Sequence, residues 1–413
     1  MIQGVLQPAT EASYLWVAVP VWAVLIITYL VRLHALLLST PDEITKSSPK
    51  RWTKDELRKA YQEREKNPIT TASYADRIPP KLDRRYIVTG GSGLVGGYIV
   101  LQLLERGQPP ESIRIVDYRR PSRSDLLEGV AAKVDFVQAD VSSTKATDKA
   151  FSKPWHPTVT PLPLTVFHTA AVIVPSDRSK LVYGVCEAVN VRGTQNVVDA
   201  SRRADADILI STSSGSISIR PVELWVAPWR FFSFSPRSAI SSHWPRHFWQ
   251  ILDEADFFLP PRKHEEYYAN YPASKAAGER IVCAAKTESF RTGSIRPANG
   301  VYGNPTDNTV GGALAKSVFP TWISHIVNSF AHGINVAIAH LNLEAVLASP
   351  SLGSASDNQR MTPQAGRPFV VTDPNAPITY GDLYLAIETL AVTPFRTVPV
   401  QPIILLIMSY LIE

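Results

Sequence analysis

The 413-residue sequence predicts an α/β protein with a doubly wound parallel sheet, a smaller C-terminal lobe and an N-terminal transmembrane helix. Three observations predict this organisation. Short apolar runs typical of strands alternate with helical patterns from residue 85 to about residue 300. A glycine-rich turn follows the first of these runs. An uncharged apolar segment of membrane-spanning length precedes them, over residues 12–31.

The composition is that of a globular protein, with 45% hydrophobic and 19% charged residues. The net charge of +5 is modest and spread along the chain. No basic block interleaved with aromatic residues occurs, so we expect no nucleic-acid partner. The two cysteines, Cys186 and Cys283, are far apart and lack metal-ligand spacing. We therefore expect a reducing compartment and no metal site.

Residues 12–31 carry no charge, and about 20 apolar residues suffice for a helix to cross a bilayer. Trp16 and Trp22 suit the membrane interface. A buried globular helix and a cleaved signal peptide are the alternatives, and the signal peptide is disfavoured because Glu11 and no basic residue precedes the run. Lysines and arginines begin only with Arg32, so the positive-inside rule places the body in the cytosol.

Hydrophobic periodicity places the elements of the body in order. Strands are expected within residues 85–91, 112–120, 134–141, 163–174, 207–218 and 290–303. Helices are expected over residues 94–107, 187–203 and 271–286. Strands that alternate with helices are typical of a parallel sheet covered on both faces.

The segment TGGSGLVGG, residues 89–97, lies where the first strand turns into the first helix. Gly90, Gly93 and Gly96 permit, in turn, a tight turn, the close approach of a pyrophosphate and the packing of helix on strand. The helix N-terminus offers free N–H groups to the phosphates. A glycine cluster often marks only a loop, but this one joins a strand to a helix. It therefore favours dinucleotide binding in a Rossmann-type domain.

Asp117 ends the second expected strand, 21 residues beyond the last of these glycines. An acid at this place bonds the adenosine ribose hydroxyls and favours NAD over NADP. Arg119 and Arg120 follow at once and can hold a 2′-phosphate, so NADP stays open. Asp140 and Val141, at the end of the third strand, suit the adenine edge. The alternative role of each acid is a cap at the strand end.

Tyr271 is followed four residues later by Lys275, which places both side chains on one face of a helix. A free tyrosine has a pKa near ~10 and is no base at neutral pH. An adjacent ammonium, together with the positive nicotinamide ring of an oxidised cofactor, favours the phenolate, so we expect Lys275 and that ring to bring the pKa of Tyr271 towards neutral pH. A chain with 15 tyrosines can carry such a pair by chance, and its place after the strand series is what favours chemistry. We expect His168, at a strand end, to be structural.

Over residues 84–395 the chain resembles the extended short-chain dehydrogenases/reductases of the 3β-hydroxysteroid dehydrogenase/isomerase family. The likeness extends to its sterol-4α-carboxylate 3-dehydrogenases and fungal membrane-anchored members. It is carried by the glycine turn and by HTAA (168–171), TSS (212–214), YPASK (271–275) and RPANGVYG (296–303), which come in the order of that family.

The resemblance implies that Ser214 bonds the substrate oxygen, that Tyr271 acts as the base and that Lys275 also bonds the nicotinamide ribose. The cofactor-binding residues that we expect from the glycine turn, the acids and the resemblance are Gly90, Gly93, Leu94, Gly96, Asp117, Asp140, Val141, Ala170, Lys275 and Pro297.

We divide the chain at three points. The four parts are a membrane anchor (1–40), a juxtamembrane linker (41–83), an NAD(P)-binding domain (84–302) with an aromatic insertion (215–270), and a substrate-binding lobe (303–413). The linker is polar and predicts a solvated helix over residues 53–66. The aromatics between Trp225 and Trp249 suit a membrane interface, a pocket wall or the core. The apolar run 402–412 is too short to span a bilayer, so it predicts an interfacial element or part of a longer one.

Together these features predict a single-pass protein of the endoplasmic reticulum membrane that oxidises a 3β-hydroxyl of a sterol or triterpenoid with NAD(P). A carboxylate at C4 would then be lost as carbon dioxide. The alternatives are a Δ5-3-ketosteroid isomerase, a nucleotide-sugar epimerase and a regulator that senses the dinucleotide without turnover. Tyr271, Ser214 and Lys275 together speak against the regulator. The physiological direction and a homodimer are left open.

Overall fold

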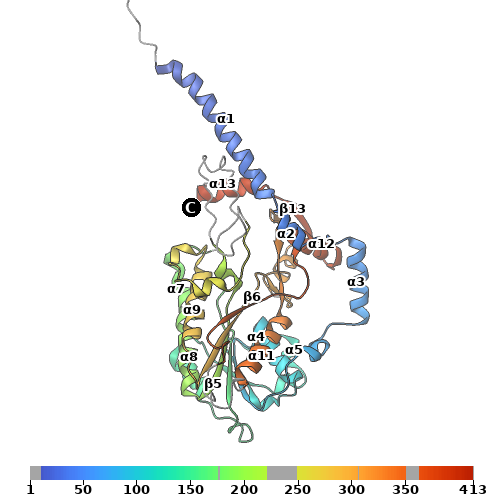
Figure 1. Cartoon of the computed structure of the whole chain (residues 1–413). Helices are drawn as coiled ribbons and strands as arrows, with labels where there is room; N and C mark the ends of the chain where they lie inside the picture. Colours follow the sequence, from blue (N-terminus) through green and yellow to red (C-terminus); the bar gives the residue numbers. More distant parts are fainter. Residues whose placement is uncertain (1–10, 175–176, 221–248, 306, 350–361, 413) are drawn as a thin grey trace, which may run out of the picture.

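A seven-stranded, wholly parallel sheet forms the centre of the computed structural model, which describes residues 11–174, 177–220, 249–305, 307–349 and 362–412 (Figure 1). The strand order is β11-β6-β5-β4-β1-β2-β3. The strands are β1 (Arg85–Thr89), β2 (Ile113–Asp117), β3 (Asp135–Gln138), β4 (Leu164–His168), β5 (Ala206–Thr212), β6 (Arg291–Pro297) and β11 (Pro368–Val371). The doubly wound fold predicted from the sequence is confirmed.

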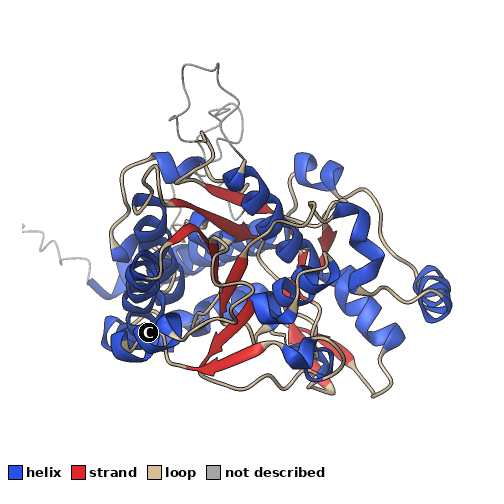
Figure 2. Ribbon diagram, turned by 90° about the horizontal axis from the view of Figure 1, so that it is seen from below, coloured by secondary structure: helices blue, strands red, loops and turns tan. Residues whose placement is uncertain are grey.

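Helices cover both faces of the sheet (Figure 2). One layer contains α4 (Leu94–Glu105) and α11 (Gly333–Ala348), with the short α5 (Ser124–Leu127) nearby. The other layer contains α6 (Thr144–Ser152), α7 (Tyr183–Cys186), α8 (Thr194–Arg203) and α9 (Asn270–Ala284). A π-helical turn, Glu187–Gly193, joins α7 to α8.

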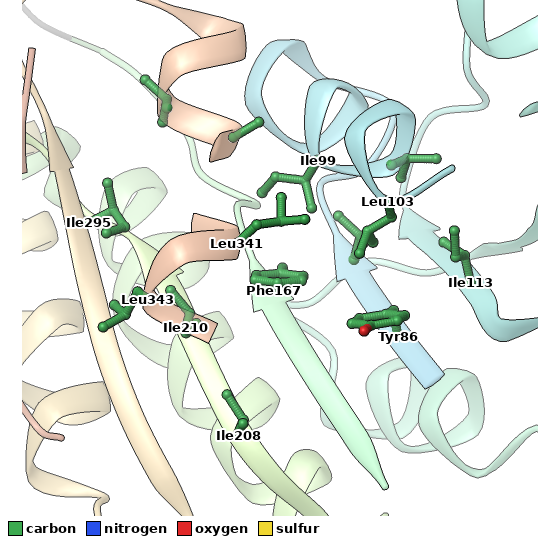
Figure 3. Close-up of a cluster of buried hydrophobic side chains, with 14 of the residues drawn as sticks. Tyr86, Ile99, Leu103, Ile113, Phe167, Ile208, Ile210, Ile295, Leu341 and Leu343 are labelled. Atoms are coloured by element: carbon green, nitrogen blue, oxygen red, sulfur yellow. The ribbon is translucent and has the colours of Figure 1, made fainter. Parts of the chain in front are cut away.

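The core lies on both sides of the sheet because successive strand residues point to opposite faces. Tyr86 and Val88 of β1 pack in the cluster under α4 and α11, where Phe167 and Leu341 also lie (Figure 3). Ile87, between them in sequence, packs in the second cluster, under α6, α8 and α9. All five side chains are fully buried. Continuous apolar strands, rather than alternating ones, are what a sheet covered on both faces requires.

The sheet extends past residue 302, where we placed the start of the lobe. β11 pairs with β6 as an edge strand, and α11 packs on α4 and on the sheet. The sequence suggested that the segment from Phe369 belongs to the lobe, and the pairing of Phe369 with Ile295 places it in the sheet instead. The role of residues 303–413 in binding substrate stays a prediction.

Short elements build the remainder of the lobe. They are β7 (Val301–Tyr302) with β10 (Ala331–His332), β9 (Val327–Asn328) with β12 (Ile378–Thr379), β8 (Val318–Thr321) with β13 (Arg396–Pro399), and the helices α10 (Gly311–Leu314) and α12 (Tyr380–Leu390). A small separate core around Tyr384, Ile387 and Phe395 holds this region together.

The juxtamembrane segment is docked on the lobe. It contains α2 (Asp42–Ser47) and α3 (Lys54–Lys66), the second of which confirms the helix expected over 53–66. α3 packs against α12, with Leu57 buried between them. The solvated linker of the sequence analysis is therefore only partly right, since one face of α3 is covered.

α1 (Glu11–Leu38) leaves the body as a long helix, and within the described residues it is the one helix long and apolar enough to cross a membrane (Figure 1). Trp16 and Trp22 are largely exposed, whereas Leu33, near the body, is buried. The apolar run near the C-terminus forms α13 (Pro402–Ile412), which packs against α1. Residues 221–248 of the aromatic insertion lie outside the described residues. Trp249, which follows them, is buried and donates from Nε1 to the carbonyl oxygen of Ser39 at 2.9 Å.

Two histidines are buried, and each is hydrogen-bonded to threonine hydroxyl groups. His168 Nδ1 lies 2.7 Å from Thr89 Oγ1, and its Nε2 lies 3.0 Å from Thr194 Oγ1. His340 Nε2 lies 2.9 Å from Thr212 Oγ1. Burial lowers the pKa of His168 to about 3 and the pKa of His340 to about 4. These contacts agree with the structural role expected for His168.

These histidines predict a loss of stability in acid. Their pKa values are lower in the folded protein than in the unfolded chain, so below about pH 6.5 only the unfolded chain takes up these protons. The free energy of unfolding should then fall by about 1.4 kcal/mol per pH unit for each histidine until the folded pKa is reached. His340→Gln should reduce the loss between pH 7 and pH 5 by about 2 kcal/mol, measured by denaturant unfolding.

The matched control is His156→Gln, at an exposed position, which should keep the wild-type slope. If the free energy of unfolding of His340→Gln and of the wild type fell equally between pH 7 and pH 5, His340 would not be a source of the loss of stability in acid.

Candidate active site

One cavity of about 450 Å³ lies at the carboxyl ends of the central strands, where open α/β sheets bind ligands. Two groups of expected site residues line it. The glycine turn contributes Gly90, Gly93, Leu94 and Gly96. The opposite side contributes Ser214, which follows β5, Tyr271 and Lys275 of α9, and Pro297 of β6. Segments almost two hundred residues apart in sequence thus meet in one space. The structure brings together the glycine turn and the three residues expected to be catalytic.

The glycine turn is closed too tightly for side chains. Gly90 has φ of +74°, in the left-handed region. A Cβ on Gly96 would lie 2.4 Å from the carbonyl oxygen of Gly90, and a Cβ on Gly90 would lie 2.6 Å from the nitrogen of Ala170. Gly93 caps the N-terminus of α4, leaving the first N–H groups of that helix free for an anion. The turn therefore fits a pyrophosphate held by backbone groups.

Asp117 is fixed beside this turn. Its carboxylate accepts hydrogen bonds from the backbone nitrogens of Ser92 and Arg119, both at 3.1 Å. Arg119 and Arg120 are exposed next to it. The carboxylate therefore lies beside the turn where an adenosine ribose is expected, and the choice between NAD and NADP stays a prediction.

Four expected cofactor contacts do not line the cavity itself, namely Asp117, Asp140, Val141 and Ala170. Asp140 accepts a hydrogen bond from the nitrogen of Ser142 at 2.8 Å, which is the alternative role of a cap at a strand end. Val141 is buried, and its carbonyl oxygen accepts from Asn196 Nδ2 at 2.9 Å. The role of these four residues in cofactor binding stays a prediction.

Ser214 and Tyr271 form the polar centre of the cavity. Ser214 follows the end of β5, and its Oγ lies 2.8 Å from Ser216 Oγ and accepts from the nitrogen of Ser216 at 3.2 Å. Tyr271 lies in the first turn of α9. Burial raises the pKa of Tyr271 to about 12, although a hydrogen bond with Ser214 acts to lower it.

Lys275 is bonded to the end of β5. Its Nζ donates to the carbonyl oxygen of Thr212 at 2.7 Å. Burial lowers the pKa of Lys275 to about 8, although the charge of Glu279 raises it. In this structure Ser214 is the group that acts to lower the pKa of Tyr271, and desolvation of the tyrosine outweighs this hydrogen bond. The expected lowering of the pKa by Lys275 together with the oxidised nicotinamide ring stays a prediction.

A second set of contacts holds α9 against the π-helical turn. Asn190, buried in the π-helical turn, donates from Nδ2 to Ser274 Oγ and to the carbonyl oxygen of Val172, both at 2.9 Å. Gly278 allows the close approach of the two helices, since a Cβ there would lie 2.4 Å from the carbonyl oxygen of Asn190. The position of Tyr271 therefore depends on a glycine two turns away.

The sequence analysis missed several residues that line the cavity. Tyr268 has Pro272 and no lysine four residues later, so it lacks the spacing of Tyr271 and Lys275, yet it lines the cavity and hydrogen-bonds Ser216. Asp307 closes the lobe side and accepts from the backbone nitrogens of Gly303, Thr309 and Val310 at 2.7–3.0 Å. The cluster of Asn, Pro, Asp and Gly over residues 304–312 was a signal for such a turn.

Residues 87–220 match the 3-beta hydroxysteroid dehydrogenase/isomerase family. This match covers about a third of the chain, which is similar to the family over that range. It is 28% identical over 224 residues to the mouse protein named 3 beta-hydroxysteroid dehydrogenase type 7, an alignment that covers 53% of this chain and 50% of the relative. It is 26% identical over 256 residues to the Schizosaccharomyces pombe protein named sterol-4-alpha-carboxylate 3-dehydrogenase erg26, decarboxylating, covering 61% of this chain and 62% of the relative.

The chain thus spans between half and two thirds of the length of these family relatives. Among solved structures, it is similar to a putative epimerase from Burkholderia cenocepacia, with a TM-score of 0.51 and 17% identity. That comparison covers 78% of this chain and 84% of the epimerase. At this identity the likeness shows a shared fold.

The contact at Gly278 predicts how the site is held. Gly278→Ala adds a methyl group 2.4 Å from the carbonyl oxygen of Asn190, so α9 must shift. We expect the free energy of unfolding to fall by about 1–3 kcal/mol, measured by thermal and denaturant unfolding. Ala284→Ser, which adds one atom at an exposed position of the same helix, is the control and should be neutral. Equal stability of the two variants would show that α9 and the π-helical turn accommodate the added methyl group without loss of stability.

Proposed function

We propose that this protein is a membrane-anchored, NAD(P)-dependent dehydrogenase that oxidises the 3β-hydroxyl of a sterol or triterpenoid. The observation that carries the proposal is the cavity in which Ser214, Tyr271 and Lys275 stand opposite the glycine turn. The names of the two family relatives support the substrate class.

The polar centre of the cavity can take up the proton of an alcohol. The substrate hydroxyl sits between Ser214 and Tyr271, where Ser214 donates a hydrogen bond to the oxygen and Tyr271 Oη, as phenolate, accepts the proton. Gly90, Gly93 and Gly96 would hold the dinucleotide, whose nicotinamide would supply the acceptor for the hydride of the carbinol carbon. Lys275 supplies a positive charge that favours the phenolate once its ammonium can reach towards the cofactor ribose. The carbonyl product then leaves.

A carboxylate on the neighbouring carbon adds a second step. Oxidation would convert the substrate into a β-keto acid, in which the ketone accepts the electron pair released when the carbon–carboxyl bond breaks. Loss of carbon dioxide needs no further catalytic group. The runner-up activity is isomerisation of a 3-ketosteroid double bond in the same cavity, and Tyr271 or Tyr268 would then move the proton.

The anchor suits a substrate of this class. A sterol partitions into the bilayer, so an enzyme tethered by α1 meets it at high local concentration. Basic residues follow α1, including Lys46 and Lys50, and would rest on anionic cytosolic lipid. We propose the endoplasmic reticulum membrane as its location, with the body in the cytosol.

Tyr271→Phe tests the base. The phenyl ring keeps the packing and loses only the proton acceptor, so kcat should fall by about 100-fold or more while dinucleotide binding persists. The measurements are NAD reduction with 3β-hydroxysterols and binding of NAD by calorimetry.

The control for this test is Tyr267→Phe. Tyr267 lies outside the catalytic cavity, with its ring under the Arg262 guanidinium, 4.1 Å away. Tyr268 is less suitable because it lines the cavity. Substantial turnover by Tyr271→Phe would remove Tyr271 from this role.

Asp117→Ala tests the choice of cofactor. A carboxylate bonds the ribose hydroxyls of NAD and repels the 2′-phosphate of NADP, so the wild type should prefer NAD. Loss of the carboxylate should lower kcat/KM with NAD by about tenfold, so that the ratio of kcat/KM with NAD to kcat/KM with NADP falls. A wild-type preference for NADP would instead assign the site to Arg119 and Arg120.

A further inference from the structure

A second cavity, of about 170 Å³, lies between the lobe and the segment that follows α1. Trp52 from that segment and Phe330, Ile378 and Leu383 from the lobe form part of its wall. Its lining is mainly apolar, and it lies apart from Ser214 and Tyr271.

Trp52 is a fixed part of this wall. Its backbone nitrogen donates to Asp382 Oδ1 at 3.1 Å, and the adjacent Arg51 forms an ion pair with the other carboxylate oxygen. Burial alone would raise the pKa of Asp382, but hydrogen bonds from Thr379, Trp52 and Arg51 lower it. Lys54 adds an ion pair with Glu388 of α12, at 2.9 Å.

The main acidic group of the cavity is already satisfied. Asp373 accepts from Tyr302 Oη at 2.8 Å, from the nitrogen of His332 at 2.8 Å and from Asn335 Nδ2 at 2.6 Å. Asn328 Nδ2 donates to the carbonyl oxygen of Asn299 at 2.5 Å. The cavity therefore offers a guest chiefly apolar surface rather than polar partners.

Only a thin wall separates the two cavities. Thr309 lines both, and on β7 Val301 lines the catalytic cavity while Tyr302 lines the second. Gly300, in the wall of the catalytic cavity, lies against Phe330, since a Cβ on it would be 2.7 Å from Phe330 Cδ1. The side chains of Thr309 and Phe330 are the groups that would have to move to join the two spaces.

We infer that the second cavity receives the hydrocarbon end of the substrate, remote from the carbinol. The inference rests on the proposed function and adds where the apolar part binds. A sterol has one polar end, which suits Ser214 and Tyr271, and a long apolar remainder, which gains free energy when it leaves water. The segment after the membrane anchor, through Trp52, thereby becomes a determinant of substrate length.

Ala376→Trp tests this inference. Ala376 lies at the exposed rim of the second cavity, so an indole there reduces the space without disturbing the core. We expect KM to rise about tenfold for a 3β-hydroxysterol with its full side chain. KM for a 3β-hydroxysteroid that lacks the side chain should not change, nor should kcat for either. The control is Ala132→Trp, at an exposed position that lines neither cavity.

A binding assay separates this inference from the proposed function. The probe is dehydroergosterol, a fluorescent sterol with a side chain, and energy transfer from tryptophan reports its binding to the full chain in detergent. Weaker binding by Ala376→Trp than by Ala132→Trp supports binding of the sterol side chain in the second cavity. If the wild type binds the probe in this way but oxidises no 3β-hydroxysteroid, only the proposed function is overturned. Equal binding by the two variants, equal KM values for the long substrate, or no binding by the wild type would overturn the inference.

Discussion

The hydrogen bond from Lys275 Nζ to the carbonyl oxygen of Thr212 joins the two halves of the candidate active site. A buried ammonium is costly unless its N–H groups are paired, so this contact fixes α9 against the end of β5. Ser214 follows Thr212 by two residues, and Tyr271 precedes Lys275 by one helical turn. This bond between a side chain and the backbone thus links the position of Tyr271 to that of Ser214, beside the contacts of Asn190 and Gly278.

Charges behind this bond extend the same constraint. Glu279, one turn further along α9, accepts two hydrogen bonds from Arg296 of β6, at 2.8 and 2.6 Å. Arg296 also pairs with Asp256 at 2.6 Å, in the part of the insertion that follows Trp249. Arg296 and Glu279 are buried and Asp256 is partly buried, so losing one partner would leave an unpaired charge in the interior. Helix α9 with the proposed catalytic residues, the sheet and the described part of the insertion are therefore joined into one unit.

Much of the fold could be predicted from local pattern. Strand and helix periods are set by residues a few positions apart, so β1 to β6, α4 and α9 were recognisable in the sequence. The turn at Gly90, Gly93 and Gly96 was recognisable because its spacing has a steric cause. The same is true of the pair Tyr271 and Lys275, which one helical turn brings to one face.

What the sequence did not reveal depends on contacts between distant segments. Tyr268 belongs to the cavity because of where α9 begins relative to Ser216, not because of its neighbours. Trp52 meets a wall whose other residues lie hundreds of positions later. The pKa of Tyr271 is dominated by burial, which a spacing rule cannot measure. β11 joins the sheet after a long excursion through the lobe, where periodicity gives no partner.

The docking of the segment after α1 has a geometric consequence. Arg51, Trp52 and Lys54 bind α12, and Ser39 binds Trp249, so the body is clamped to the end of α1 rather than hung from a flexible chain. With α1 in a bilayer, Tyr271, the proposed base, would then lie at a fixed height above the lipid surface. An amphipathic molecule in the leaflet presents only the groups of its polar end at such a height. The docked segment would thus fix the distance between the active site and the membrane. Regioselectivity would then follow from the depth of each substrate group in the membrane as well as from the shape of the cavity.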